Sequence, residues 1–139
     1  MAVTICSLDG GLGALEVGTG VMEGLQLLRA EAEFLGGGRG ATLRYWLTDF
    51  TCVADSRTTS EQVLELAEAQ AARVPEIPDL LVALVVRLDV SFGMVRMWQL
   101  RHEARGTGWE TRLFRDRIEA EDWLRRRMRE KYDIEITFA

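Results

Sequence analysis

The sequence has few of the side chains that usually carry reaction chemistry. It contains one histidine, His102, one lysine, Lys131, and two cysteines, Cys6 and Cys52, which are far apart. A structural zinc site takes about four thiolate or imidazole ligands, so three are too few, and we expect no metal. The cysteines are interpreted as buried, reduced thiols of a cytoplasmic protein, or as a disulfide if they lie on neighbouring strands.

Several other features are also missing. No apolar run approaches the 18 residues of a membrane span, and the first residues lack the basic and apolar regions of a signal peptide. The net charge of −5 argues against a nucleic-acid partner, which would require a basic surface. Neither a G-x-x-x-x-G-K-[ST] loop nor a G-x-S-x-G elbow is present. We therefore expect a cytoplasmic location, no membrane span, no cofactor and no enzymatic activity.

The apolar pattern predicts one α/β domain over residues 1–139. The expected strands are 3–8, 14–17, 43–50, 80–86 and 112–115, with 133–139 as an extra edge strand. Helices are expected between them and after 112–115. The order predicts a mixed, largely parallel sheet of four to five strands, an antiparallel N-terminal β-hairpin and about four flanking helices. The run 80–86 is apolar throughout, which is typical of a strand covered on both faces.

Capping signals predict where the helices begin. Thr19 is expected to cap a helix whose buried stripe is Val21, Leu25, Leu28, Ala32 and Leu35. Thr58 and Glu61 form a capping-box pattern before the next helix. Asp89 or Ser91 is expected to cap the third helix, and Asp116 the fourth, whose inward residues are Ala120, Trp123, Leu124 and Met128.

Polar residues follow the predicted parallel strands, where ligands collect in open α/β sheets. These are Asp49, Thr51, Asp55 and Ser56 after the first buried strand, Asp89 and Ser91 after the second, and Asp116 after the third. Oxygen-rich rims can hold Mg²⁺ or a phosphate ester. Helix capping explains Asp89 and Asp116 equally simply, and we favour it.

The third helix places Met94, Val95, Trp98 and His102 on one face. This position indicates a histidine at the core boundary rather than an acid–base catalyst. Trp98 favours core packing, whereas Trp109 lies in a glycine-containing loop and has the better claim to exposure. Met94, Trp98 and Trp109 are the residues expected to wall a ligand pocket, if one exists.

Four sets of residues occur in a distinctive combination: Asp49-Phe50, Phe92-Gly93 with Arg96-Met97, Phe114-Arg115-Asp116, and Ala120-Glu121-x-Trp123-Leu124. Together they resemble the SpoIIAA-like, or STAS-like, family. The resemblance implies a small mixed sheet packed by helices, as in anti-sigma factor antagonists and SEC14-type relatives. In the antagonist branch, a serine in a Ser-Ser-Gly-like turn is phosphorylated. Ser56 is the nearest match here, but the glycine is missing.

Three functions are compatible with these observations. The first is a non-enzymatic regulatory module that binds a protein partner through a rim made of Asp49, Thr51, Asp55, Ser56, Thr58 and Thr59. A homodimer is a separate alternative. The second is a carrier of a small apolar or acyl ligand, which would require an apolar cavity of roughly 300 Å³ or more. The third is a magnesium-dependent enzyme in which Asp49, Asp89 and Asp116 converge.

Overall fold

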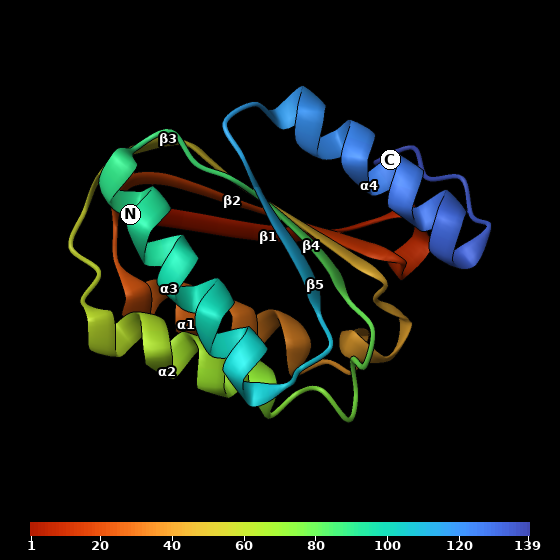
Figure 1. The fold of residues 1–139 in the computed structure, drawn as a ribbon, viewed down its shortest axis with the longest axis horizontal. Coiled ribbons are helices and arrows are strands. Elements are labelled where there is room, and N and C mark those ends of the chain that lie inside the picture. Colours follow the sequence, from red (N-terminus) through yellow and green to blue (C-terminus); the bar gives the residue numbers. More distant parts are fainter.

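The computed structural model describes residues 1–139, except for the side chain of Val90. Five strands alternate with four helices in the predicted order (Figure 1). The strands are β1 (Ala2–Leu8), β2 (Gly13–Met22), β3 (Tyr45–Ser56), β4 (Leu81–Val85) and β5 (Glu110–Phe114). The helices are α1 (Gly24–Leu35), α2 (Ser60–Ala71), α3 (Asp89–Arg105) and α4 (Arg117–Tyr132). Two short 3₁₀ turns, η1 (Asp9–Gly11) and η2 (Arg39–Thr42), complete the chain.

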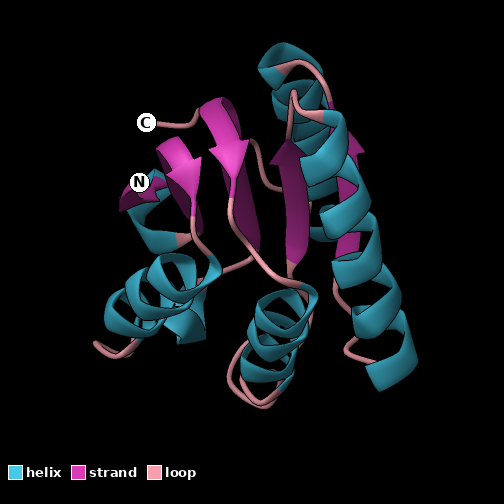
Figure 2. Cartoon of the chain, turned by 90° about the vertical axis from the view of Figure 1, so that its left-hand side faces the viewer, coloured by secondary structure: helices cyan, strands magenta, loops and turns pink.

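The strands form one mixed sheet in the order β1-β2-β3-β4-β5. β1 and β2 pair antiparallel as the predicted hairpin, and the other neighbours pair parallel. Each parallel strand lies beside the one before it, so right-handed crossovers place α1, α2 and α3 on the same face. α4 follows the last strand and covers the opposite face (Figures 1 and 2). The predicted fold class is confirmed.

The sheet separates two apolar cores. β4 contributes to both: Val82 and Leu84 face α1–α3, whereas Leu81, Ala83 and Val85 face α4. This burial on both faces explains why the β4 sequence is apolar without interruption. The predicted inward residues of α4, Ala120, Trp123, Leu124 and Met128, are all buried.

The predicted start of the first helix is wrong. Thr19 lies in β2, where it pairs with Ala2 of β1 and Cys52 of β3, and α1 begins at Gly24. Pairing with strands on both sides stabilises β2 beyond its expected end, an effect that local periodicity does not contain. The buried stripe is displaced as well. Leu25 and Ala32 are exposed, and the buried residues are Gly24, Leu27, Glu31, Phe34 and Leu35.

Two helix caps also differ from the prediction. The capping box of α2 uses Thr59 and Gln62 instead of Thr58 and Glu61, because β3 continues to Ser56 and shifts the turn by one residue. At α3 the N-cap position is Leu88, without a side-chain cap, so Asp89 and Ser91 do not cap it. Asp116 caps α4 as predicted, by accepting a hydrogen bond from the Ile118 amide.

Residues 133–139 do not form the predicted edge strand. Asp133 ends α4 in a left-handed conformation, and the segment then returns to η1. There the Asp9 carboxylate accepts hydrogen bonds from the amides of Thr137 and Phe138. The Asp9 side chain thus holds this segment, in place of the strand pairing that its alternating apolar residues predicted.

The cysteines are not buried. Cys6 and Cys52 are both exposed and free, so neither the buried-thiol interpretation nor the disulfide holds. They lie on β1 and β3, on either side of β2 in the sheet. Among the described helices, none is long and apolar enough to cross a membrane.

Candidate functional site

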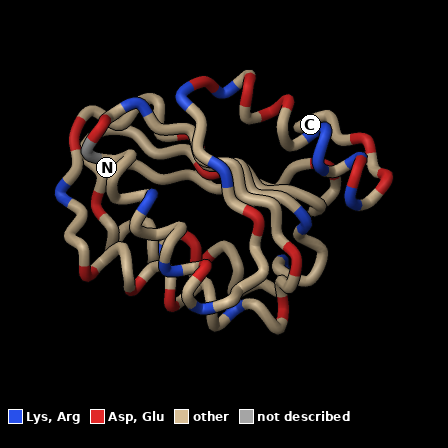
Figure 3. The backbone as a smooth tube through the Cα atoms, in the orientation of Figure 1, with Lys and Arg blue, Asp and Glu red and all other residues tan. Residues whose placement is uncertain are grey.

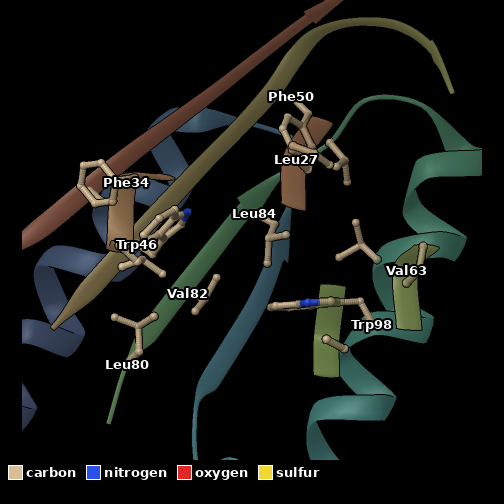
Figure 4. Close-up of a cluster of buried hydrophobic side chains, with 14 of the residues drawn as sticks. Leu27, Phe34, Trp46, Phe50, Val63, Leu80, Val82, Leu84 and Trp98 are labelled. Carbon is tan, nitrogen blue, oxygen red and sulfur yellow. The ribbon is translucent and has the colours of Figure 1, made fainter. Parts of the chain in front are cut away.

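A pocket lies between the sheet and helices α1, α2 and α3. Its cavity volume is about 80 Å³. Most of its wall is apolar, and Figure 4 shows side chains of the three helices, Leu27, Val63 and Trp98, directed towards side chains of β3 and β4. The polar residues in the wall are Glu16, Glu31, Thr48, Thr58, Gln62 and Gln70.

Two glutamates meet inside this pocket. Glu16 is on β2, on the same side as the buried Ala14, and is 2% exposed. Glu31 is on α1, one turn after Leu27, and is 8% exposed. Their carboxyl groups are close enough for each to affect the pKa of the other. A direct hydrogen bond between two carboxyl groups requires a proton on one of them.

The remaining contacts of Glu16 involve only one of its two oxygens. Glu16 Oε1 accepts hydrogen bonds from Thr48 Oγ1 at 3.0 Å and from the Trp46 indole nitrogen at 3.4 Å. Glu16 Oε2 is buried and receives none from the described donors. Oε2 is therefore the oxygen that is left for a proton or for a donor from outside the chain.

Burial dominates the ionisation of this pair. Burial, and next the neighbouring Glu31 carboxylate, hold the pKa of Glu16 well above its ordinary value of 4.5. Burial also raises the pKa of Glu31, against the hydrogen bond from Gln70 that lowers it. Two adjacent carboxylates in an apolar pocket would repel each other, so retention of one proton is the low-energy state.

A chain of hydrogen bonds continues from Glu31 to α3. Gln70 Nε2 donates to Glu31 Oε1 at 2.7 Å, and Gln70 Oε1 accepts from the Trp98 indole nitrogen at 2.6 Å. The same amide oxygen lies 2.8 Å from His102 Nε2, and Thr107 Oγ1 lies 3.0 Å from His102 Nδ1. Because an amide oxygen only accepts, Nε2 carries the imidazole proton.

His102 is 2% exposed and stacks on Trp109, with ring centroids 5.1 Å apart. Burial lowers the pKa of His102 to about 4, against a small opposing effect of Glu68. The imidazole is therefore neutral at pH 7. Both ring nitrogens are engaged within the protein, which fits the predicted core-boundary role.

The three predicted wall residues, Met94, Trp98 and Trp109, all line this pocket. Trp109 is only partly exposed, because its indole nitrogen donates to the Ile77 carbonyl at 2.7 Å. That bond ties the loop before β5 to the segment that leads into β4.

The three rim aspartates do not converge. Asp49 pairs with Arg117 at 3.2 Å, Asp89 pairs with Arg115 at 2.9 Å, and Asp116 caps α4. No group of three histidine, cysteine or acidic residues suited to a metal occurs among the described residues. The predicted convergence on Mg²⁺ is therefore wrong. Asp49 and Thr51 lie within β3, which is longer than predicted, and Ser91 is buried.

The other predicted rim residues run from the end of β3, at Asp55 and Ser56, through the turn that leads to α2, at Thr58 and Thr59. Asp55 accepts a hydrogen bond from the Ser56 amide, and Ser56 Oγ accepts one from the Thr58 amide at 3.2 Å. Thr59 caps α2, so Ser56 precedes the helix by several residues instead of opening it. Asp55 and Thr59 are exposed, whereas Ser56 and Thr58 are half-buried.

The sequence reasoning missed Glu16, Glu31 and Gln70. Glu16 occupies an inward position of an alternating strand, and that strand was predicted to end before its alternation was complete. Glu31 was missed because the predicted buried stripe of α1 differs by one position from the observed one. A charged residue at an inward position is the signal that could have found both.

Elements further from the pocket are held by ion pairs. Acidic and basic residues follow one another along α4 (Figure 3). Arg125 lies 4.0 Å from Glu121, four residues earlier, and it also pairs with Asp122 at 3.3 Å. The charged face of α4 is largely compensated within the helix.

The sheet order and the helices on its two faces define an α/β fold of the SpoIIAA-like class. A solved structure with this fold matches the chain with a TM-score of 0.51 and 19% sequence identity, over 88% of this chain and 92% of that one. It is an uncharacterized protein from the DUF3478 family, from Shewanella loihica PV-4. The match confirms the SpoIIAA-like fold. No family model matches the chain, and no curated protein matches it.

Proposed function

We propose that this protein is a non-enzymatic binding module whose pocket between the sheet and α1–α3 holds a small, mostly apolar ligand. The observation that carries the proposal is the Glu16–Glu31 pair, because two carboxyl groups are buried inside an otherwise apolar wall. Burying a carboxyl group without full compensation destabilises a fold. A bound ligand that interacts with the two carboxyl groups would supply the missing compensation.

The size of the cavity restricts the ligand. The expectation of roughly 300 Å³ for a carrier of an acyl chain is far above the observed 80 Å³. An apolar cavity of about 150 Å³ accommodates benzene, so this pocket suits a molecule of only a few heavy atoms. The acyl-chain version of the carrier hypothesis does not fit.

Indole resonances provide a direct test. Trp46, Trp98 and Trp109 line the pocket, whereas Trp123 lies in the core beneath α4. Titration of the ¹⁵N-labelled protein with n-propanol should shift the three pocket indole signals saturably and leave that of Trp123 in place. A Val82→Leu variant, which fills the cavity, should lose the response. If the three pocket signals do not move, the proposal is wrong.

Native mass spectrometry of the protein purified from its own source gives a second test. A mass above that of the polypeptide, lost on denaturation, would reveal a retained ligand. The same spectrum reports a homodimer or a phosphorylated form. The bare polypeptide mass, together with silent indole signals, would leave no support for a binding pocket.

A second candidate is a protein-interaction surface on the β3–α2 turn. The specific observation is that Asp55, Arg57, Thr59 and Ser60 are exposed within six residues. A Ser56→Glu variant should change the set of proteins captured on the immobilised chain. A matched Ser7→Glu variant, at an exposed position of β1, should not. Identical capture by both variants and the unmodified protein would refute this candidate.

A further inference from the structure

We propose that the Glu16–Glu31 pair binds the ammonium group of a small primary alkylamine, with the alkyl part in the apolar section of the pocket. This inference rests on the proposed function and specifies its ligand class. It depends on three features of the pocket: a free acceptor, the charge of the wall and the size of the cavity.

The acceptor is Glu16 Oε2. This atom is fully buried, belongs to a side chain that lines the pocket, and receives no hydrogen bond from the described donors. The other oxygen of the same carboxyl group is already occupied by Thr48 and Trp46. An ammonium group has three N–H donors and no acceptor. It can therefore serve Glu16 Oε2 and the Glu31 carboxylate at once.

The charge of the wall selects a cation. Glu16 and Glu31 are the only ionisable residues among the described residues of the wall. Arg73 lies outside the wall, and its charge lowers the pKa of Glu31. An anionic ligand would still face two carboxyl groups with no positive charge in the wall itself. A cation would form charge-assisted hydrogen bonds with them, which are stronger than those of a neutral alcohol.

The rest of the wall suits a short alkyl chain. Leu27, Val82, Leu84 and Trp98 are all less than a tenth exposed and contribute only apolar surface or an indole that already has a partner. With a cavity volume of about 80 Å³, the ligand has a few heavy atoms beyond its nitrogen. Propylammonium is a probe of suitable size and chemistry.

The experiment compares three probes of the same length at constant ionic strength: propylammonium chloride, n-propanol and sodium propionate. The readout is the set of four indole signals, with Trp123 as the internal control. We expect saturable shifts of the Trp46 signal with propylammonium at lower concentration than with propanol, and none with propionate. Trp46 is the most informative reporter because its indole nitrogen donates to Glu16.

Glu16→Gln and Glu31→Gln keep the shape of each side chain and remove its charge. Charge-assisted hydrogen bonds are expected to make each variant bind propylammonium about tenfold to a hundredfold more weakly. Propanol binding should be retained, which also shows that the variants are folded. Glu103→Gln, at an exposed position of α3, is the matched control and should bind as the unmodified protein does.

The outcomes separate the two proposals. If propanol shifts the pocket signals but propylammonium does not, or if Glu16→Gln and Glu31→Gln bind propylammonium unchanged, the amine inference is overturned and the binding module stands. If propionate binds best, the site prefers anionic ligands and the amine inference is again overturned. If no probe moves the pocket signals, both proposals fail.

Discussion

Replacing Glu16 by glutamine should make the protein more stable, by an amount that grows with pH. In the folded protein, burial and the neighbouring Glu31 raise the pKa of Glu16, which favours its protonated form. The amide of glutamine has nearly the same shape and can donate from the same position at every pH. The variant therefore imitates the protonated form of the pair permanently, and Thr48 and Trp46 keep their acceptor on the other oxygen.

The sign follows from proton linkage. The pKa of Glu16 is well above 4.5 in the folded state because of its burial and the neighbouring Glu31. Between the unfolded-state pKa and this raised pKa, the folded protein binds one more proton than the unfolded chain. Its free energy of unfolding therefore falls as pH rises, by about 1.4 kcal/mol for each pH unit within that window. Below pH 4.5 the contribution is fully present.

The measurement is urea unfolding followed by tryptophan fluorescence from pH 4.5 upwards. The contribution of His102 is common to both proteins and cancels in the difference between them. The stability difference between Glu16→Gln and the unmodified protein should widen with pH until the folded-state pKa is passed. Glu103→Gln should follow the unmodified protein throughout. Parallel curves for Glu16→Gln and the unmodified protein would refute the raised pKa of Glu16.

Three further predictions concern other parts of the fold. His102, with a folded pKa of about 4, should show no titration of its imidazole NMR signal between pH 8 and pH 5.5. The free energy of unfolding should fall as pH drops from 6.5 towards 4, because the unfolded chain takes up the proton first. An NMR midpoint near 6.5 would contradict the burial argument. Leu124→Ala should lower the free energy of unfolding by about 2–5 kcal/mol, because the side chain is fully buried beneath α4; a loss below 1 kcal/mol would show that this core collapses around the gap. Gly13→Ala should lower the free energy of unfolding, measured in urea, by about 1–3 kcal/mol, because a Cβ there would lie 1.9 Å from Cζ of Tyr45. Unchanged stability would mean that the Tyr45 ring moves aside freely.

Local patterns in the sequence were sufficient for the architecture. The unbroken apolar run of β4 indicated a strand covered on both faces, and the order of elements then required a mostly parallel sheet with crossover helices. The inward face of α4 followed from spacing alone, and so did its Asp116 cap. These features depend on residues close together in the chain, which is why periodicity and capping preferences predict them.

Element ends were less predictable because partners distant in the sequence determine them. β2 and β3 extend beyond their expected ends since each pairs along its length with the other, and β2 also pairs with β1. The C-terminal segment alternates like a strand but is held by the Asp9 carboxylate instead. Nothing within either segment distinguishes these outcomes.

The sequence by itself determined a SpoIIAA-like α/β sheet with helices on both faces, and it placed His102 on the inward face of the third helix. Only the tertiary structure revealed the pocket and its acidic pair. Glu16 and Glu31 come from a strand and a helix that are 15 positions apart, and each alone resembles an ordinary solvated glutamate. Packing of α1 against the sheet brings them together and removes them from water. That burial raises their pKa values and converts two common surface residues into a candidate binding site.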